Sequence, residues 1–229
     1  MEVLTGGFKL DVPEGAFPLS TDSILLSGFV RLPRNAQVLD LGSGCGTLGL
    51  LLCAKDEHCH ITGVEKDSLA HEGALKNIEQ NHLGVRMDSI CADLRTISRH
   101  FEPGQFDYCL SNPPYFTGGP ASRTAPLARR DDDCTLDDLC AAASKMLKYG
   151  GDFALVHKPE RLAEICACAA KHSLEPKRLC SIRHHPRSPV NLILLSCRKG
   201  GKPGLIWEEQ CLFDEQGQPT DYYRTLYNL

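Results

Sequence analysis

The sequence predicts an α/β fold in which a seven-stranded, mostly parallel sheet carries helices on both faces and ends in an antiparallel hairpin. From about Ala36 onward, apolar runs of strand length alternate with segments of helix length, a pattern typical of such sheets. A glycine-rich turn directly follows the first apolar run. The last two runs are joined only by residues 184–189, which are too few for a crossover, so this pair is expected to be antiparallel.

The seven expected strands are short apolar runs, several of which end at glycine or polar residues. They cover residues 36–41, 60–64, 85–91, 106–110, 152–157, 178–183 and 190–197. Each run has a length typical of a strand, and the helical segments between them favour parallel pairing.

Helix signals lie between these strands. Residues 47–54 follow the glycine-rich turn, and Asp67 is a suitable N-cap for a helix that runs to Asn81. A further helix is expected from Thr135 or Asp137 to about residue 149, where two glycines would end it. Pro159 is suited to the first turn of the next helix.

The chain divides into three expected parts. Residues 1–35 would form an extension that covers the cofactor and substrate, residues 36–200 the core, and residues 201–229 an extension that packs on the core. No repeat or low-complexity linker occurs. The length of 229 residues suits one domain with small additions.

Composition excludes several classes of protein. No apolar run approaches the roughly 18 residues of a membrane span, and Lys9 and Asp11 interrupt any signal-peptide core, so we expect a soluble, cytoplasmic protein without a membrane partner. The 12 cysteines include no Cys-x-x-Cys pair, which argues against zinc. Reduced, buried thiols and no bound metal are therefore expected.

Charge is distributed unevenly in a protein whose formal net charge is −4. Between residues 171 and 202, eight basic residues face a single acid, Glu175, and the last twenty-odd residues are mainly acidic. A local basic face can hold phosphates, but an ordinary solvated surface would look the same. Charge alone leaves the two interpretations equal.

The glycine-rich turn, Asp40 to Gly46, has the spacing Gly-x-Gly-x-Gly. Such a turn allows a ligand to approach the backbone closely, although dinucleotide-binding enzymes share this feature. Their pattern is Gly-x-Gly-x-x-Gly, and a carboxylate directly before the turn would not help to bind a pyrophosphate. Asp40 instead favours a cationic ligand such as S-adenosylmethionine.

Two further acids follow the next strands. Glu65 ends the second strand, where a carboxylate can accept from both ribose hydroxyls, an interaction worth about 1.5–3 kcal/mol. Asp93 follows the third strand, where it can accept from an adenine amino group. Glu65 alone would also suit a nicotinamide cofactor, and each acid could simply be a surface residue.

The segment Ser111 to Phe116, with the sequence SNPPYF, follows the fourth strand. Two prolines alone would make a rigid turn. The Asn112 side-chain oxygen and the Pro113 carbonyl can both accept from an exocyclic amine, which leaves its lone pair directed at a methyl donor. Tyr115 offers a ring for base stacking, worth about 1–3 kcal/mol. This chemistry needs no general base before transfer.

These motifs, taken in order, resemble the class I, Rossmann-like methyltransferases that carry an Asn-Pro-Pro-Tyr motif. Within them, the chain is similar to the bacterial tRNA1(Val) (adenine-37-N6)-methyltransferase family from Phe8 to Asn228. The segments that carry the closer resemblance are Thr21–Leu26, Ala128–Arg129, Cys134–Asp138, Lys158–Leu162 and Leu174–Leu179. The resemblance implies transfer of a methyl group from S-adenosylmethionine to N6 of the adenine beside the anticodon of a valine tRNA, a tRNA modification.

The resemblance also guides the expected site residues. The expected catalytic residues are Asn112, Pro113, Pro114 and Tyr115. The expected cofactor contacts are Asp22, Asp40, Gly42, Ser43, Gly44, Gly46, Glu65, Lys66, Asp93, Leu94 and Asn112.

Transfer RNA is the expected partner of a monomer or weak dimer. Moving a base of a single-stranded loop into an active site costs less free energy than extruding a base from a duplex. The expected RNA contacts are Arg123, Arg129, Arg130, Lys177, Arg178, Arg183 and Arg187. His184 and His185 are expected to be loop residues. The family has His-Glu where this chain has Arg130 followed by three aspartates, a difference that bears on the identity of the RNA.

Three other functions fit parts of the pattern. In a protein glutamine N5-methyltransferase, the amide of the substrate glutamine would present the same two hydrogens to Asn112. Such enzymes, however, usually carry a helical domain before the cofactor fold, and only about 35 residues precede the first strand here. A DNA adenine methyltransferase would need a target-recognition region. A catalytically silent RNA-binding protein with this fold would bind the cofactor without turnover.

Overall fold

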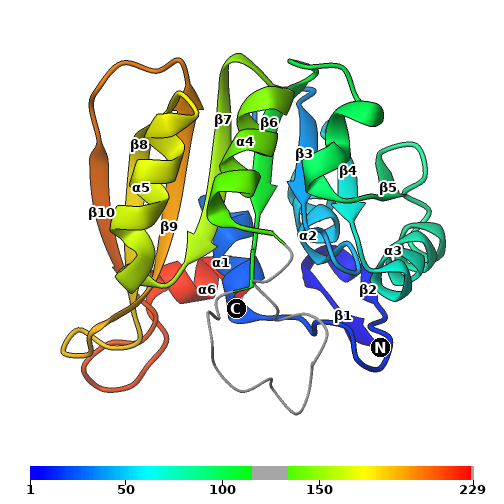
Figure 1. The fold of residues 1–229 in the computed structure, drawn as a ribbon. Helices are drawn as coiled ribbons and strands as arrows, with labels where there is room; N and C mark the ends of the chain where they lie inside the picture. Colours follow the sequence, from blue (N-terminus) through cyan, green and yellow to red (C-terminus); the bar gives the residue numbers. More distant parts are fainter. Residues whose placement is uncertain (115–133, 228–229) are drawn as a thin grey trace.

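The computed structural model describes residues 1–114 and 134–227 (Figure 1). Its main sheet has eight strands in the order β10-β8-β9-β7-β6-β3-β4-β5, and a small hairpin of β1 and β2 lies apart from it. The strands of the main sheet are β3 (Gln37–Leu41), β4 (His60–Glu65), β5 (Met87–Cys91), β6 (Phe106–Ser111), β7 (Leu147–His157), β8 (Leu174–Arg183), β9 (Val190–Lys199) and β10 (Ile206–Cys211). The small hairpin pairs β1 (Glu2–Val3) with β2 (Lys9–Leu10).

Helices cover both faces of the sheet, as predicted. The α-helices are α1 (Thr21–Phe29), α2 (Thr47–Lys55), α3 (Ser68–Gln80), α4 (Leu136–Met146), α5 (Leu162–Lys171) and α6 (Asp221–Tyr227), and the 3-10 helices are η1 (Thr5–Gly7), η2 (Leu94–Arg99) and η3 (Pro159–Arg161). In Figure 1, α4 and α5 lie in front of the sheet, and α1, α2 and α6 lie behind it.

Alternation along the strands builds two apolar cores, one on each face. On β3, Val38 packs in the core formed with α1, α2 and α6, whereas the next residue, Leu39, packs in the core formed with α4 and α5. Both side chains are 0% exposed. The apolar residues of a central parallel strand therefore face a core on each side, which is why this run was recognisable in the sequence.

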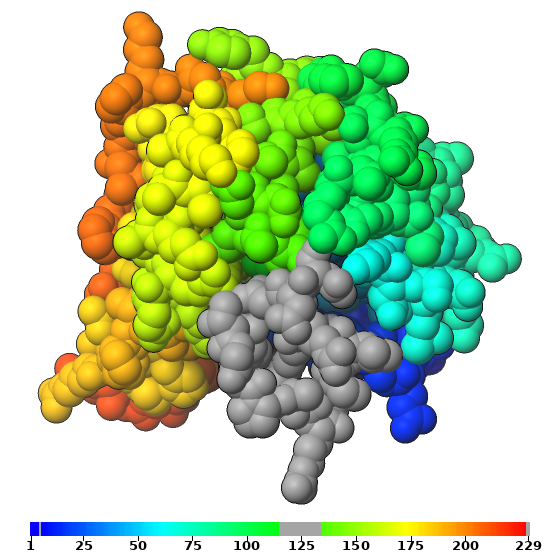
Figure 2. All heavy atoms as spheres, in the orientation of Figure 1, coloured from blue at the N-terminus to red at the C-terminus, as the bar shows by residue number. Residues whose placement is uncertain are grey.

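The prediction of seven strands was one short. The seven expected strands are present, and β9 is antiparallel to both β7 and β8, as predicted. The eighth strand, β10, pairs in parallel with β8 at the edge of the sheet. Figure 2 shows the side chains of β10, in orange, along the edge of the molecule beside the yellow α5 and β8. An edge strand is held by backbone pairing and needs no apolar run, so the sequence IWEEQC carried no clear strand signal.

The helix ends were predicted with mixed success. Asp67 caps α3 by accepting from the Ala70 amide at 2.9 Å, as predicted. Thr135 caps α4 in a capping box with Asp138. However, α4 ends at Met146 rather than near residue 149, because Leu147 is fully buried and already pairs with Phe106 in the sheet.

Cysteines and potential metal ligands give a simple picture. All 12 cysteines are free thiols, and most are buried. Within residues 1–114 and 134–227, no group of three or more His, Cys, Asp or Glu side chains is arranged to hold a metal ion. In the same part of the chain, no helix is long and apolar enough to cross a membrane.

Candidate active site at the carboxyl edge of the sheet

A cavity of about 700 Å³ opens at the carboxyl ends of the central strands. It lies where the strand order reverses, because β3 connects to β4 on one side and has β6 on the other. Ligands of open α/β sheets bind at such a switch point, and the volume suits a nucleoside-sized ligand. The predicted cofactor residues that line it are Asp22, Gly42, Ser43, Gly44, Glu65, Lys66, Asp93, Leu94 and Asn112.

The turn after β3 forms the floor of this cavity. Gly42 and Gly44 have φ values of 77° and 54°, which favour glycine. The amide of Gly42 donates to the Val64 carbonyl at 2.9 Å, and the amide of Gly44 donates to the Glu65 carboxylate at 2.8 Å. A Cβ at either glycine would meet no atom within 4 Å. The backbone therefore faces open space here, as close approach by a ligand requires.

Gly46 has a different role in the structure. It lies outside the residues that line the cavity. A Cβ on Gly46 would lie 2.7 Å from the Met87 methyl carbon, and the φ of 80° also favours glycine. Packing of the turn against β5 and α3 accounts for this glycine without a contact to the cofactor.

Asp40 also lies outside the cavity lining, buried at 1% exposure on β3. Within the described chain, neither of its carboxylate oxygens has a hydrogen-bond partner. Burial, and then the nearby charge of Glu65, raise the pKa of Asp40 to about 8. In the cofactor-free structure this carboxyl group is therefore mainly protonated at pH 7, and the expected contact of Asp40 with a cationic cofactor stays a prediction.

Glu65 is held at the end of β4 by two backbone amides. Its Oε2 accepts from Gly44 and its Oε1 accepts from Asp67, both at 2.8 Å. Each carboxylate oxygen has a second lone pair and can accept another hydrogen bond. The carboxylate is thus fixed in orientation at the cavity wall while it keeps acceptor capacity.

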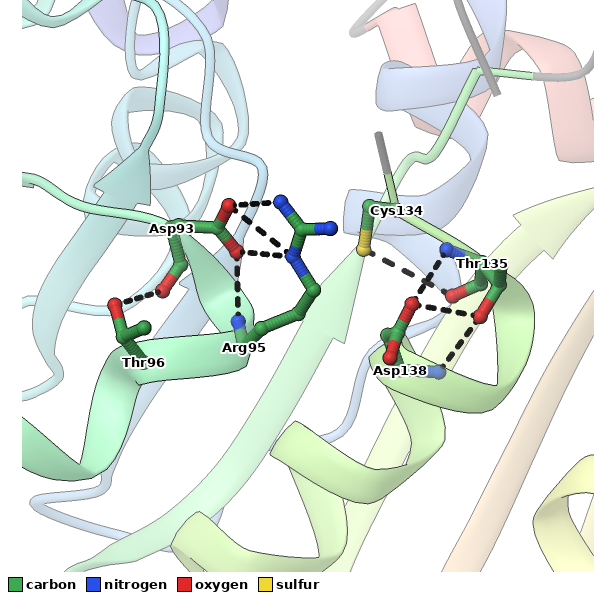
Figure 3. Close-up of polar contacts among 6 residues, drawn as sticks. All are labelled: Asp93, Arg95, Thr96, Cys134, Thr135 and Asp138. Atoms are coloured by element: carbon green, nitrogen blue, oxygen red, sulfur yellow. Dashed lines mark hydrogen bonds and ion pairs between the residues drawn. The ribbon is translucent and has the colours of Figure 1, made fainter. Parts of the chain in front are cut away.

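Asp93 is paired with Arg95 at the rim of the cavity (Figure 3). Its Oδ1 accepts from the Arg95 amide at 2.9 Å and from Nε at 3.0 Å. The hydrogen bond from the Arg95 side chain lowers the pKa of Asp93 below its ordinary value. In Figure 3 the guanidinium extends from Asp93 toward Cys134, just before α4. Asp93 is therefore an ionised acceptor whose oxygens already serve an arginine.

Asn112 follows β6 and lines the cavity together with Pro113 and Pro114. The Ser111 hydroxyl donates to the Leu41 carbonyl at 2.6 Å and fixes the end of the strand. The Asn112 Nδ2 donates to the Ser23 hydroxyl at 3.0 Å. The amide is therefore oriented by helix α1. Tyr115 lies outside the described residues.

The sequence interpretation missed several residues that line the cavity, namely Phe17, His157, Lys158 and Arg161. His157 is buried at the end of β7, and its Nδ1 accepts from the Lys158 amide at 2.8 Å. Burial, and then the charge of Arg161, lower the pKa of His157 to about 4, so the imidazole is neutral at pH 7. Lys158 and Arg161 could have been found from the sequence, because they follow an apolar strand and the carboxyl edge of the sheet was already the expected site.

The expected RNA contacts are placed very differently from one another. Arg178 stacks on the Phe29 ring, with 4.2 Å from its Cζ to the ring centroid, and pairs with Glu208 at 3.3 Å. Arg183 pairs with Glu209 at 3.1 Å. Because β10 pairs in parallel with β8, the two glutamates of β10 lie beside these two arginines. Both arginines are therefore paired with acids of β10, and their contact with RNA stays a prediction.

The remaining expected RNA contacts keep more exposed positions or are not described. Lys177 donates to the Lys202 carbonyl at 3.0 Å. The side chain of Arg187 is 87% exposed at the turn between β8 and β9, and it lies 3.4 Å from Glu215. Arg123, Arg129, Arg130 and the three aspartates after them lie outside the described residues.

Comparisons with known proteins agree with this geometry. The family model described as a methyltransferase small domain matches residues 20–165. The tRNA1(Val) (adenine(37)-N6)-methyltransferase of Shewanella halifaxensis is 31% identical over 175 residues, which cover 76% of this chain and 70% of the relative. The protein of the same name from Tolumonas auensis is 31% identical over 209 residues, which cover 90% and 86%.

The fold also matches solved structures. A predicted O-methyltransferase from Agrobacterium tumefaciens superposes with a TM-score of 0.77 and 21% identity, over 91% of this chain and 96% of that one. A geranyl diphosphate C-methyltransferase from Streptomyces coelicolor gives a TM-score of 0.59 over 77% of this chain and 76% of that one, at 11% identity. These likenesses show the shared architecture.

Proposed function

The chain belongs to the methyltransferase small domain family, and we propose that it methylates N6 of an adenine in tRNA with S-adenosylmethionine as the donor. The adenine that we propose is position 37 of a valine tRNA, next to the anticodon. The proposal draws on the names of the relatives and on the amine-binding chemistry of Asn112 and Pro113.

Asn112 is the observation that carries the proposal. Its amide lies at the carboxyl end of β6, on the wall of the cavity that Gly42, Gly44 and Glu65 also line. The exocyclic amine of adenine is a poor nucleophile because its lone pair is delocalised into the ring. Asn112 Oδ1 and the Pro113 carbonyl accept the two amine hydrogens, so the lone pair is directed at the methyl donor.

The remaining residues of the cavity suit a nucleoside cofactor. Glu65 would accept hydrogen bonds from the ribose hydroxyls of the cofactor, and Asp93 would accept one from its adenine amine while it also accepts from Arg95. When bound, S-adenosylmethionine supplies a methyl group on a positively charged sulfur and departs as the neutral thioether. One nitrogen–carbon bond forms as one carbon–sulfur bond breaks.

Asn112 and Pro113 also act after the transfer. The methylated nitrogen carries a positive charge and one surplus proton, and both acceptors stabilise that charge as it develops. The proton then passes to solvent, because a protonated aryl amine is strongly acidic. No side-chain base is therefore required, and the lowered pKa of His157 makes its imidazole a weak base.

The RNA substrate and the setting of the enzyme complete the proposal. A base in the anticodon loop is already single-stranded, so its entry into the cavity avoids the few kcal/mol needed to open a duplex. We propose that the enzyme is a cytoplasmic monomer or weak dimer. The 12 free thiols are typical of a reducing compartment.

The test is methyl transfer from labelled S-adenosylmethionine to unmodified bulk tRNA, followed by nucleoside analysis. The proposal expects labelled N6-methyladenosine, and it expects an anticodon stem-loop of valine tRNA to lose the label when adenine 37 is replaced by guanine. Label in protein glutamine, with none in RNA, would refute it in favour of the alternative methyltransferase. Cofactor binding without transfer to any substrate would favour a silent protein.

A further inference from the structure

The amide of Asn112 is held by two serines that lie about ninety residues earlier in the chain. Its Nδ2 is 3.0 Å from the Ser23 hydroxyl and 3.5 Å from the Ser20 hydroxyl. The two hydroxyl oxygens are 3.3 Å from each other. All three residues line the cavity, and neither serine was among the predicted site residues.

The polarity of this contact matters for the chemistry. An asparagine amide has an acceptor end and a donor end, and a half turn of the side chain exchanges them. Binding an exocyclic amine requires the acceptor end, because an NH₂ group would face another NH₂ group. When the Ser23 hydroxyl donates its only proton to the Ser20 oxygen, 3.3 Å away, it can only accept from the amide, so it pairs with Nδ2 and leaves the amide oxygen at the end that points away from α1.

Helix α1 is a rigid support for these hydroxyls. Ser20 caps the helix by accepting from the Ser23 amide at 3.3 Å, and Ser23 is 5% exposed. Leu25 and Leu26 are fully buried beneath the helix. One turn after Ser23, the Ser27 hydroxyl receives a hydrogen bond from Lys55 on α2 at 3.0 Å. The Ser23 oxygen is thus fixed by packing that is independent of substrate.

We propose that Ser23, assisted by Ser20, is a positioning residue that fixes the acceptor end of the Asn112 amide toward the substrate amine. The inference rests on the proposed function, because it assigns Ser23 a role through Asn112. It makes α1 part of the methyl-transfer machinery rather than only a cover for the cofactor. It also makes the site selective for bases that present an amine rather than a carbonyl at this position.

The test compares Ser23→Ala with Ser27→Ala, a control at a buried serine of the same helix. Loss of one hydrogen bond is expected to lower kcat for tRNA methylation about threefold to tenfold in Ser23→Ala. The KM for tRNA and the calorimetric Kd for S-adenosylmethionine should change less than twofold, and Ser27→Ala should retain the parent kcat. Ser23→Thr keeps the hydroxyl and should restore most of the kcat.

A second background isolates the orientation effect. An aspartate at position 112 presents an acceptor at either end, so it needs no serine to select the correct one. In Asn112→Asp, the Ser23→Ala change should therefore leave the residual kcat unchanged. If Ser23→Ala does not fold, Ser23→Cys supplies the same comparison, because a thiol is a weak acceptor.

The outcomes separate this inference from the proposed function. Full activity in Asn112→Ala would overturn the proposed function itself. An inactive Asn112→Ala together with equal kcat values in Ser23→Ala and Ser27→Ala would overturn the inference alone. A weaker Kd for the cofactor in Ser23→Ala, with kcat intact at saturation, would also overturn it and make Ser23 a cofactor contact.

Discussion

Replacement of Asp40 by asparagine should stabilise the cofactor-free protein, and more strongly as the pH rises. The pKa of Asp40 is raised from 3.8 to about 8, so the folded state holds this proton more tightly than the unfolded state does. The contribution of Asp40 to the free energy of unfolding is fully present below the pKa that it has in the unfolded state. It is lost as the pH rises through the pKa that it has in the folded state. Each pH unit between the two values removes about 1.4 kcal/mol of unfolding free energy.

Between pH 5 and pH 8 this amounts to roughly 4 kcal/mol, a large part of the stability of a typical domain. Asparagine has nearly the same shape as aspartic acid and does not ionise, so the Asp40→Asn variant does not lose this unfolding free energy as the pH rises. Urea unfolding at several pH values, without cofactor, measures the difference in unfolding free energy between Asp40→Asn and the parent. We expect that difference to widen steadily from pH 5 to pH 8.

Asp107→Asn is the matched control. Asp107 is a partly exposed carboxylate on β6 that pairs with Lys148 at 2.6 Å, and its pKa is lowered. Asp107 is ionised in both the folded and unfolded states above pH 5. The difference in unfolding free energy between Asp107→Asn and the parent should therefore not change between pH 5 and pH 8. A constant difference for Asp40→Asn as well would refute the claim that burial keeps the Asp40 carboxyl group protonated.

Three other predictions follow from the site and its surroundings. Glu65→Gln should weaken S-adenosylmethionine binding by calorimetry about tenfold to hundredfold, because hydrogen bonds to a charged acceptor contribute about 1.5–3 kcal/mol; an unchanged Kd would exclude a ribose contact. Gly46→Ala should lower the unfolding free energy by about 1–3 kcal/mol, because its Cβ would meet Met87 at a φ of 80°; a parent-like denaturation midpoint would contradict the packing role. Arg178→Ala should destabilise the fold by a similar amount without a change in the KM for tRNA, whereas Arg187→Ala should raise that KM and reduce its salt dependence; the reverse pattern would restore Arg178 as an RNA contact.

Local patterns account for what the sequence predicted well. The strands β3 and β6 lie in the centre of the sheet with helices on both faces, so most of their buried residues are apolar. Asp67 caps α3 through a hydrogen bond that spans three residues. The positive φ values of Gly42 and Gly44 also reflect local geometry. Each of these features depends mainly on residues that are close together in the sequence.

The features that sequence reasoning missed depend on distant parts of the chain. The protonation of Asp40 follows from its burial, which no neighbouring residue reveals. The contact of Ser23 with Asn112 joins residues 89 positions apart. The pairing of Arg178 with Glu208 joins residues 30 positions apart on two strands. Tertiary packing decided all three cases.

The most direct test of the account is methyl transfer to unmodified tRNA by Asn112→Ala, with Asn191→Ala, an exposed asparagine on β9, as the control. We expect the parent and Asn191→Ala to form N6-methyladenosine at equal rates. Asn112→Ala should be at least about a hundredfold slower, because it lacks one of two acceptors that stabilise the transition state, while its Kd for S-adenosylmethionine stays within about threefold. An Asn112→Ala variant that forms N6-methyladenosine within a few-fold of the parent rate would contradict the mechanism.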